Sequence, residues 1–119
     1  MMNLNQTIMN SATFEIKPFV PREKERSWQP IKLKEAIEAA TGLDITNQKR
    51  DRRYTETRFI FFHLADKHSH ARLGEIGRHV KRTHATVIHG LKQFDSLYQY
   101  DLKFRRYADE VIGKVMTGI

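Results

Sequence analysis

The sequence predicts an all-α protein, a small helical bundle that contains a helix-turn-helix. Apolar residues recur at three- and four-residue spacing in several separate stretches, which is the period of an amphipathic helix. One of these stretches, residues 72–91, is typical of two short helices joined by a turn of three or four residues. Residues that commonly cap helices stand at the expected ends, with Gly42 after one helical stretch and Thr83 before another.

Length and composition indicate one domain preceded by a leader. The chain has 119 residues, of which 39% are apolar and 29% charged, as is usual for a soluble globular protein. It contains no cysteine, which excludes disulfides and thiolate metal sites. No apolar run has the length of a signal peptide or a membrane span, so we expect a cytoplasmic protein without a membrane partner.

Positive charge is concentrated in one part of the chain. The net charge is +7, with 21 Lys and Arg against 14 Asp and Glu. Between Gln48 and Lys92 there are eleven basic and four acidic residues, and the rest of the chain holds ten of each sign. The whole excess therefore surrounds the predicted helix-turn-helix, as a polyanion-binding surface requires. The alternative is an ordinary solvated surface.

The first elements are a leader over residues 1–29 and a helix over residues 31–41, which opens a domain over residues 30–116. The leader is expected to be flexible or partly ordered, and four of its residues favour a short strand-like arm instead: Phe14, Ile16, Phe19 and Val20. Trp28 is interpreted as a packing anchor. The helix carries an apolar stripe of Ile31, Leu33, Ala36, Ile37 and Ala40.

A basic loop over residues 48–54 leads into the central helix. Thr55 is the predicted N-cap, and the helix is expected to continue to about Lys67. Its residues are apolar on most sides, with Phe59 expected to be partly exposed. Three histidines in and after this helix, His63, His68 and His70, are interpreted as surface residues. A metal site is the alternative, but no fourth ligand of a suitable kind accompanies them.

The helix-turn-helix comes next and is followed by a closing helix. Its first helix is predicted from Leu73 to Val80, and Gly77 is expected to let one helix cross close to another. Thr83 is the predicted N-cap of the second helix. The last helix follows a break at residues 98–100 and runs to about Val115. The apolar face of the second helix consists of Val87, Ile88, Leu91, Phe94 and Leu97.

Two motifs in this region resemble a known family. Residues 75–77 (Glu-Ile-Gly) and 83–90 (Thr-His-Ala-Thr-Val-Ile-His-Gly) are similar to the signature of the C-terminal DNA-binding domain of the bacterial replication initiator DnaA. The family form is EIG followed by GRDHTTV[IL]HA, and the resemblance covers roughly residues 30–112. It implies a Trp repressor-like helical fold. This chain has Thr83 in place of Asp, Ala85 in place of Thr or Ser, and one residue fewer between Val80 and His84.

The resemblance implies that the protein binds double-stranded DNA. Its basic loop would enter the minor groove, through Lys49, Arg50, Arg52 and Arg53. Arg58 aligns with a family arginine that reaches the major groove. Arg78 and Lys92 are assigned to phosphates, which position a protein without reading bases. His89 is interpreted as a core residue. The residues expected over base edges and flanking phosphates are Lys81, Arg82, Thr83, His84, Ala85 and Thr86.

The sequence shows no enzyme motif and predicts no cofactor, no metal and no small-molecule substrate. There is no glycine-rich phosphate loop, and no serine lies in a nucleophile motif. Since fewer than fifty residues precede the basic loop, we expect no ATPase module. The leading hypothesis is a nucleoid-associated DNA-binding protein with one of three roles. It marks an origin, competes with the initiator for its sites, or regulates transcription. Other possible classes are a module that docks on a replication protein and an RNA-binding protein, although only Tyr54 and Phe59 provide the exposed aromatic residues that RNA binding favours.

Overall fold

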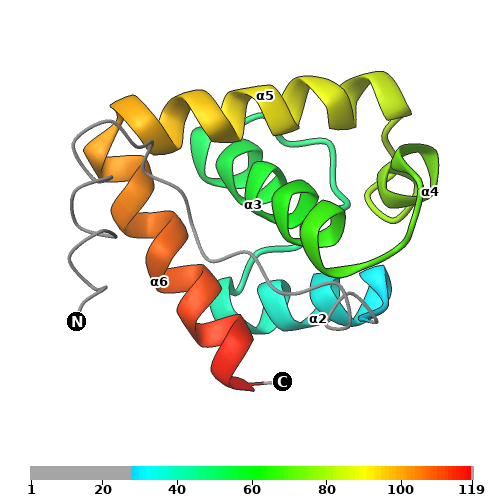
Figure 1. Cartoon of the computed structure of the whole chain (residues 1–119), viewed down its shortest axis with the longest axis horizontal. Coiled ribbons are helices and arrows are strands. Elements are labelled where there is room, and N and C mark those ends of the chain that lie inside the picture. Colours follow the sequence, from blue (N-terminus) through cyan, green and yellow to red (C-terminus); the bar gives the residue numbers. More distant parts are fainter. Residues whose placement is uncertain (1–27, 119) are drawn as a thin grey trace, which may run out of the picture.

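The computed structural model describes residues 28–118, which form five helices and no strand (Figure 1). The predicted all-α class is therefore confirmed. Most of the predicted leader, including the four residues of the possible arm, lies outside the described residues. None of the described helices is long and apolar enough to cross a membrane. The helices are α2 (Pro30–Thr41), α3 (Arg52–His68), α4 (Leu73–Arg78), α5 (His84–Tyr100) and α6 (Leu102–Gly118).

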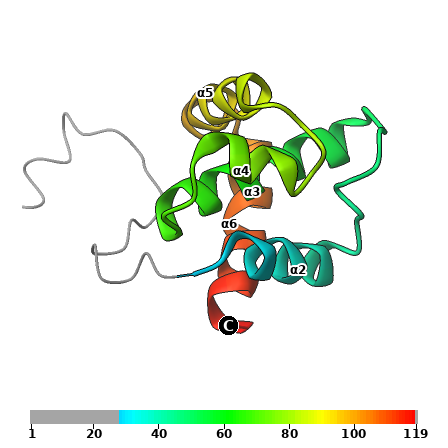
Figure 2. The same ribbon diagram turned by 90° about the vertical axis from the view of Figure 1, so that its right-hand side faces the viewer.

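Helix α3 lies at the centre of the bundle and packs against each of the other four helices. Helix α5 crosses one side of α3, with α4 near its beginning and α6 leading away from its end (Figure 1). Helix α2 packs against α3 and α6 on the other side. The segment between α2 and α3 loops out at one edge of the bundle (Figure 2). This arrangement leaves the α2–α3 segment and the start of α5 available to form a surface.

The core forms where the apolar stripes of the helices meet. Three consecutive residues of α3, Ile60, Phe61 and Phe62, are buried, as the apolar run predicted for a central helix. Phe94 of α5 stacks on His63 with 4.0 Å between ring centroids and meets Phe104 of α6 edge-on at 5.4 Å. These ring contacts hold α3, α5 and α6 together, because aromatic pairs at such distances add to the effect of area burial.

Helix α2 has the predicted ends. Pro30 occupies its first turn, where a missing N–H does no harm. Gly42 has a φ of 75° and donates its N–H to the carbonyl of Glu38 at 2.7 Å, which confirms the predicted C-cap. Trp28 stacks on His68 with 5.1 Å between centroids, and its backbone N–H donates to the His68 carbonyl at 3.1 Å. The predicted packing anchor is therefore confirmed.

The predicted start of α3 was wrong. The helix begins at Arg52, with Asp51 at the N-cap position, so Thr55 lies inside the first turn and its hydroxyl donates to the Arg50 carbonyl at 3.3 Å. The side chain of Arg52 pairs with Glu56 one turn later and with Asp101 beyond the end of α5. These contacts stabilise a first turn that has no repeating apolar pattern, which is why periodicity alone did not reveal it.

Two of the three histidines were wrongly assigned to the surface. His63 is 4% exposed and His68 is 2% exposed, whereas His70 is exposed as predicted. Burial lowers the pKa of His63 to about 3, and the nearby charges of Lys67 and His68 act in the same direction. Both buried imidazoles stack on aromatic rings, His63 on Phe94 and His68 on Trp28. Their polar character alone had suggested a surface position. Among the described residues, no group of three His, Asp or Glu side chains is placed to hold a metal ion.

Helix α5 turns its apolar stripe toward α3, with two exceptions to the prediction. Val87 and Phe94 are fully buried, but Ile88 is 37% exposed. His89, predicted to be a core residue, is exposed. Helix α5 approaches α3 closely at Gly90, where a Cβ would collide with the ring of Phe62. The family form has alanine at this position, so the glycine accommodates the large Phe62 ring.

Candidate nucleic-acid interface

Helices α4 and α5 form a helix-turn-helix whose turn spans residues 79–83. This turn is longer than the predicted three or four residues, because α4 ends at Arg78 and not at Val80. Val80 is fully buried beneath the turn and links it to the core. Thr83 caps α5 as predicted, since its side chain accepts a hydrogen bond from the N–H of Thr86 at 3.4 Å.

Gly77 brings α4 into direct contact with the backbone of the turn. Its carbonyl accepts hydrogen bonds from the N–H groups of Val80 at 3.0 Å and Arg82 at 2.8 Å. A Cβ at Gly77 would lie 2.5 Å from the carbonyl oxygen of Arg82 and 3.1 Å from that of Thr83. The sequence predicted a close approach of two helices at this glycine, but the close contact is with the turn, and it sets where α5 begins.

Lys81 adopts an unusual backbone conformation within the same turn. Its φ is 59°, and among the described residues it is the only one other than glycine with a positive φ. The family form has glycine in this part of the turn, where this chain is one residue shorter. The left-handed conformation costs a residue with a Cβ roughly 1–2 kcal/mol. It leaves the Lys81 side chain exposed beside the start of α5.

The first turn of α5 presents small polar groups to solvent. Thr83, His84 and Ala85 are exposed, and Thr86 is partly exposed. The two threonine hydroxyls lie 3.4 Å apart. The first turn of α5 therefore offers hydroxyl, imidazole and methyl groups at the free end of a helix, which are the groups that contact base edges in a major groove.

A basic hollow of about 390 Å³ lies between the α2–α3 segment and α5. Its lining includes Arg50 from that segment, Arg58 from α3, and Arg82, Thr86 and His89 from the helix-turn-helix. Residues far apart in the sequence thus form one cationic surface beside the start of α5. A polyanion such as a phosphate backbone fits this charge.

Arg58 is part of the wall of this hollow and is not free. It is 5% exposed, and its guanidinium donates to the carbonyls of Ile45 at 2.9 Å and Asn47 at 2.7 Å. Arg82 donates to the same Asn47 carbonyl at 3.0 Å. Burial, and then the charge of Arg82, lower the pKa of Arg58, although a guanidinium still remains protonated in proteins. The two arginines together fasten the α2–α3 segment to the helix-turn-helix.

A second hollow, of about 510 Å³, lies on the other side of the α5 start. Its lining includes Arg72, Arg78 and His84, together with the acidic Glu75. Arg78 is exposed, as its predicted phosphate contact requires, and Lys92 is exposed two turns along α5. Arg72 was not singled out in the sequence, although it directly precedes α4 and is also exposed. Cationic side chains therefore flank the first turn of α5 on both sides.

The basic stretch at residues 49–53 is divided between two surfaces. Lys49 is exposed, with its ammonium 5.4 Å from the centre of the Tyr54 ring, and Arg50 faces the basic hollow. Arg52 and Arg53 belong to α3 and line a different hollow beside α6. The predicted single basic loop was therefore wrong, since only Lys49 and Arg50 lie on the α2–α3 segment.

Sequence reasoning missed His89, which lines the basic hollow, and Asn47, which holds two arginines of its wall. His89 lies three residues after Thr86, and residues at this spacing share a helix face. Because Thr86 was predicted to face DNA, the three-residue spacing could have indicated that His89 is exposed as well. Asn47 contributes through its backbone carbonyl and its side-chain oxygen, which lies 3.1 Å from the Arg58 guanidinium. Nothing in the sequence pattern marks such a contact.

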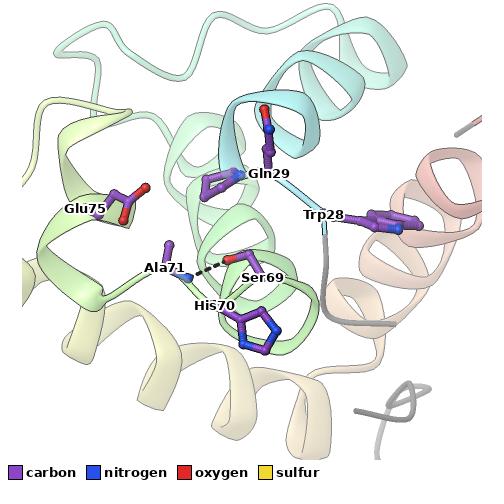
Figure 3. A pocket seen from close by; sticks show the side chains of 7 residues that line it. Trp28, Gln29, Ser69, His70, Ala71 and Glu75 are labelled. Carbon is purple, nitrogen blue, oxygen red and sulfur yellow. Dashed lines mark hydrogen bonds between the residues drawn. The ribbon is translucent and has the colours of Figure 1, made fainter. Parts of the chain in front are cut away.

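Another hollow holds none of the predicted DNA-binding residues, although it shares Glu75 with the hollow at the start of α5. It has a volume of about 310 Å³, and Trp28, Ser69, His70 and Glu75 are among the side chains around it (Figure 3). The Ala71 N–H donates to the Ser69 hydroxyl at 3.2 Å on its wall.

Comparisons with known proteins agree with this geometry. A family model described as the bacterial DnaA protein helix-turn-helix matches residues 39–93. The chromosomal replication initiator protein DnaA of Thermodesulfovibrio yellowstonii is 30% identical over 117 residues, which cover 92% of this chain and 26% of that protein. DnaA of Flavobacterium psychrophilum is 29% identical over 72 residues, which cover 60% of this chain and 15% of that protein.

The chain thus spans about a quarter or less of the length of these two relatives. No solved structure matches the chain significantly. The family match includes α3, α4 and most of α5, and so contains the helix-turn-helix and the basic hollow. Residues 39–93 are thus similar to the bacterial DnaA helix-turn-helix family.

Proposed function

We propose that this protein binds duplex DNA with sequence preference, in a role related to the initiation of replication or its regulation. The observation that carries the proposal is the exposed first turn of α5, flanked by cationic side chains on both sides. In helix-turn-helix proteins the start of the second helix contacts base edges in the major groove. The match of residues 39–93 to the bacterial DnaA helix-turn-helix model and the names of the two relatives support the link to replication.

Within this proposal, the residues divide into readers and anchors. Thr83, His84, Ala85 and Thr86 read base edges from the start of α5. The α2–α3 segment, led by Arg50 with Lys49 beside it, enters the adjacent minor groove. The cations around these two elements contact phosphates, which fixes the register of the protein on the duplex. These anchors are Arg72, Arg78, Lys81 and Lys92.

Arg58 and Arg82 have a different role in the proposal. Both donate to the Asn47 carbonyl, so they position the α2–α3 segment relative to α5. Arg58 was predicted to reach a base edge, but its guanidinium is engaged with backbone carbonyls. A loss of affinity in Arg58→Ala could therefore come from a displaced α2–α3 segment or from a lost DNA contact. Replacing Arg50 tests the DNA contact without this ambiguity.

Replacing Arg50 and Lys92 separately should weaken binding in two distinguishable ways. We expect Arg50→Ala to cost about 1–3 kcal/mol on the preferred site and to reduce discrimination against random duplex, because it removes a groove contact. Lys92→Ala should weaken both duplexes alike and reduce the slope of log affinity against log salt by about one. Fluorescence anisotropy with both duplexes over a salt series measures these effects.

The same titrations have outcomes that oppose the proposal. Equal losses for both variants on both duplexes would show that Arg50 does not read bases. A folded wild-type protein without duplex affinity at low salt would refute DNA binding and favour a module that docks on a protein.

A further inference from the structure

The basic hollow beside the start of α5 has walls from two elements that would enter different grooves of a duplex. Arg50 lies on the α2–α3 segment, which is assigned to the minor groove. His89 lies on α5, whose first turn is assigned to the major groove. One sugar–phosphate strand separates a major groove from the adjacent minor groove. With both elements in place, that strand must cross the hollow between Arg50 and His89.

The His89 side chain is held in place and has a hydrogen-bond donor without a partner in the described part of the chain. It is exposed, and its ring nitrogens form no hydrogen bond with another described residue. The ring of Phe59 meets it edge to face, with 6.3 Å between centroids and 73° between planes. Phe59 in turn lies against α5, because a Cβ at Gly90 would come 3.2 Å from its ring. Since an imidazole always carries at least one N–H, His89 can donate to an acceptor in the hollow.

The charge in the wall of the hollow favours an anionic acceptor. The guanidinium groups of Arg58 and Arg82 donate to backbone carbonyls, and neither forms an ion pair with a described carboxylate. Burial, and then repulsion by the charge of Arg82, lower the pKa of Arg58. A negative charge placed in the hollow would relieve this repulsion, and water screens charges in such a wall less than it screens exposed ones.

The position of His89 along α5 favours a phosphate over a base edge. His89 lies six residues after Thr83, so at about 1.5 Å per residue it is roughly 9 Å further along the helix axis. The major groove is about 8.5 Å deep. For a helix that enters the groove by its first turn, Thr83 therefore lies near the base edges, and His89 lies near the height of the sugar–phosphate backbone.

We propose that the basic hollow seats one phosphate of the strand between the two grooves, and that His89 donates a hydrogen bond to it. This inference rests on the proposed function, because it requires α5 and the α2–α3 segment to occupy adjacent grooves. Arg58 and Arg82 stabilise the phosphate charge from the wall, and Phe59 positions the imidazole. His89 is thus an anchor, and the base preference of the first turn of α5 does not depend on it.

Duplexes with single neutral methylphosphonate linkages test the proposal on the full chain. The duplex carries the site that the wild-type protein enriches from randomised sequences, and each phosphate is replaced in turn. One linkage between the two grooves should cost the wild-type protein about tenfold in affinity, because the hydrogen bond at this linkage is charge-assisted. His89→Ala should bind the unmodified duplex several-fold more weakly and lose only about threefold or less at that linkage, through the wall charges. Lys92→Ala is the matched control on α5 and should keep the full loss there.

Three further variants separate a phosphate contact from a structural role. His89→Gln keeps a donor and should restore most of the affinity that His89→Ala loses. Phe59→Leu keeps an apolar contact with α5 but removes the ring that orients His89. It should weaken binding in the wild-type background and have no further effect beside His89→Ala. His70→Ala removes an exposed histidine that does not line this hollow and should bind like the wild-type protein.

The outcomes distinguish a failure of this inference from a failure of DNA binding. Equal losses at every linkage for the wild-type protein and His89→Ala would overturn the phosphate seat and leave DNA binding intact. His89 would instead read a base if His89→Ala changed the enriched consensus. A loss on a 7-deazapurine duplex in the wild-type protein alone would have the same meaning. A folded wild-type protein that binds no duplex would overturn the proposed function, and this inference with it.

Discussion

Replacing Gly77 with alanine should destabilise the protein by about 3 kcal/mol and remove most of its affinity for duplex DNA. A Cβ at this position would lie 2.5 Å from the carbonyl oxygen of Arg82, and a backbone atom cannot move aside as a flexible side chain can. Overpacking in an interior commonly costs 1–3 kcal/mol, and contact with backbone places this site at the upper end. Relief of the contact would shift the turn and with it the start of α5.

Gly74 provides the matched control on the same helix. A Cβ at Gly74 would meet only the end of the Arg78 side chain, at 3.9 Å. Gly74→Ala should therefore leave stability unchanged or raise it by up to about 1 kcal/mol, through higher helix propensity. Urea denaturation compares the free energies of unfolding of the two variants. Equal stability of Gly77→Ala and Gly74→Ala would show that the close approach at Gly77 does not shape the turn.

Lowering the pH from 7 to 5 should destabilise the protein by about 2 kcal/mol through His63 alone. Burial lowers the pKa of His63 from 6.5 in the unfolded chain to about 3 in the fold. The folded state therefore favours neutral His63, and this contribution to stability is complete above pH 6.5. It is lost as the pH falls from 6.5 toward 3, because only the unfolded chain takes up the proton in that range.

The pH dependence, and not the absolute stability, identifies His63. Unfolding free energies at pH 7 and pH 5 should differ by about 2 kcal/mol less in His63→Leu than in the wild-type protein. The exposed His70 is the control, and His70→Gln should keep the wild-type difference. If His63→Leu keeps it as well, then His63 is protonated in the fold and its burial beside Phe94 has been misjudged.

The helical bundle could be predicted from sequence because its signals are local. The Gly42 and Thr83 caps depend on residues within one turn, and both predictions were confirmed. The start of α3 could not be predicted in this way. It is held by the pairing of Arg52 with Asp101, which is 49 residues away in the chain. A first turn stabilised from such a distance leaves no periodic pattern.

The candidate interface was predicted more accurately at α5 than at the basic stretch. Thr83, His84 and Ala85 are exposed at the start of a helix, as the resemblance implied, although their contact with bases stays a prediction. The basic stretch was treated as one loop, but helix geometry turns Arg52 and Arg53 toward α6. The charges along a sequence predict that a surface is basic. Which surface each side chain reaches depends on the backbone conformation at that residue.

Arg58 shows the limit of carrying a role over from a family. Its position in the sequence implied a contact with the major groove. In the fold, its guanidinium bonds to two backbone carbonyls and lies next to Arg82. Both carbonyls belong to the α2–α3 segment, whose path the sequence does not specify. The contact that decides the role of this side chain is therefore visible only in three dimensions.

Selection of bound sites from randomised duplexes tests the central claim most directly. The claim is that the first turn of α5 reads base pairs. The wild-type protein should enrich a consensus related to the box of the DnaA initiators, with a changed or relaxed preference at one or two base pairs. This departure follows from Thr83 in place of an aspartate, which tends to select cytosine, and from Ala85, which lacks a hydroxyl. Each changed contact is worth roughly 1–3 kcal/mol.

The same selection should be repeated with the double change Thr83→Asp with Ala85→Thr. The account predicts that the enriched consensus then moves toward the initiator's box at those base pairs, while the flanking preferences remain. An unchanged consensus in the double variant, or no enrichment by a folded wild-type protein, would contradict the claim that the start of α5 reads sequence.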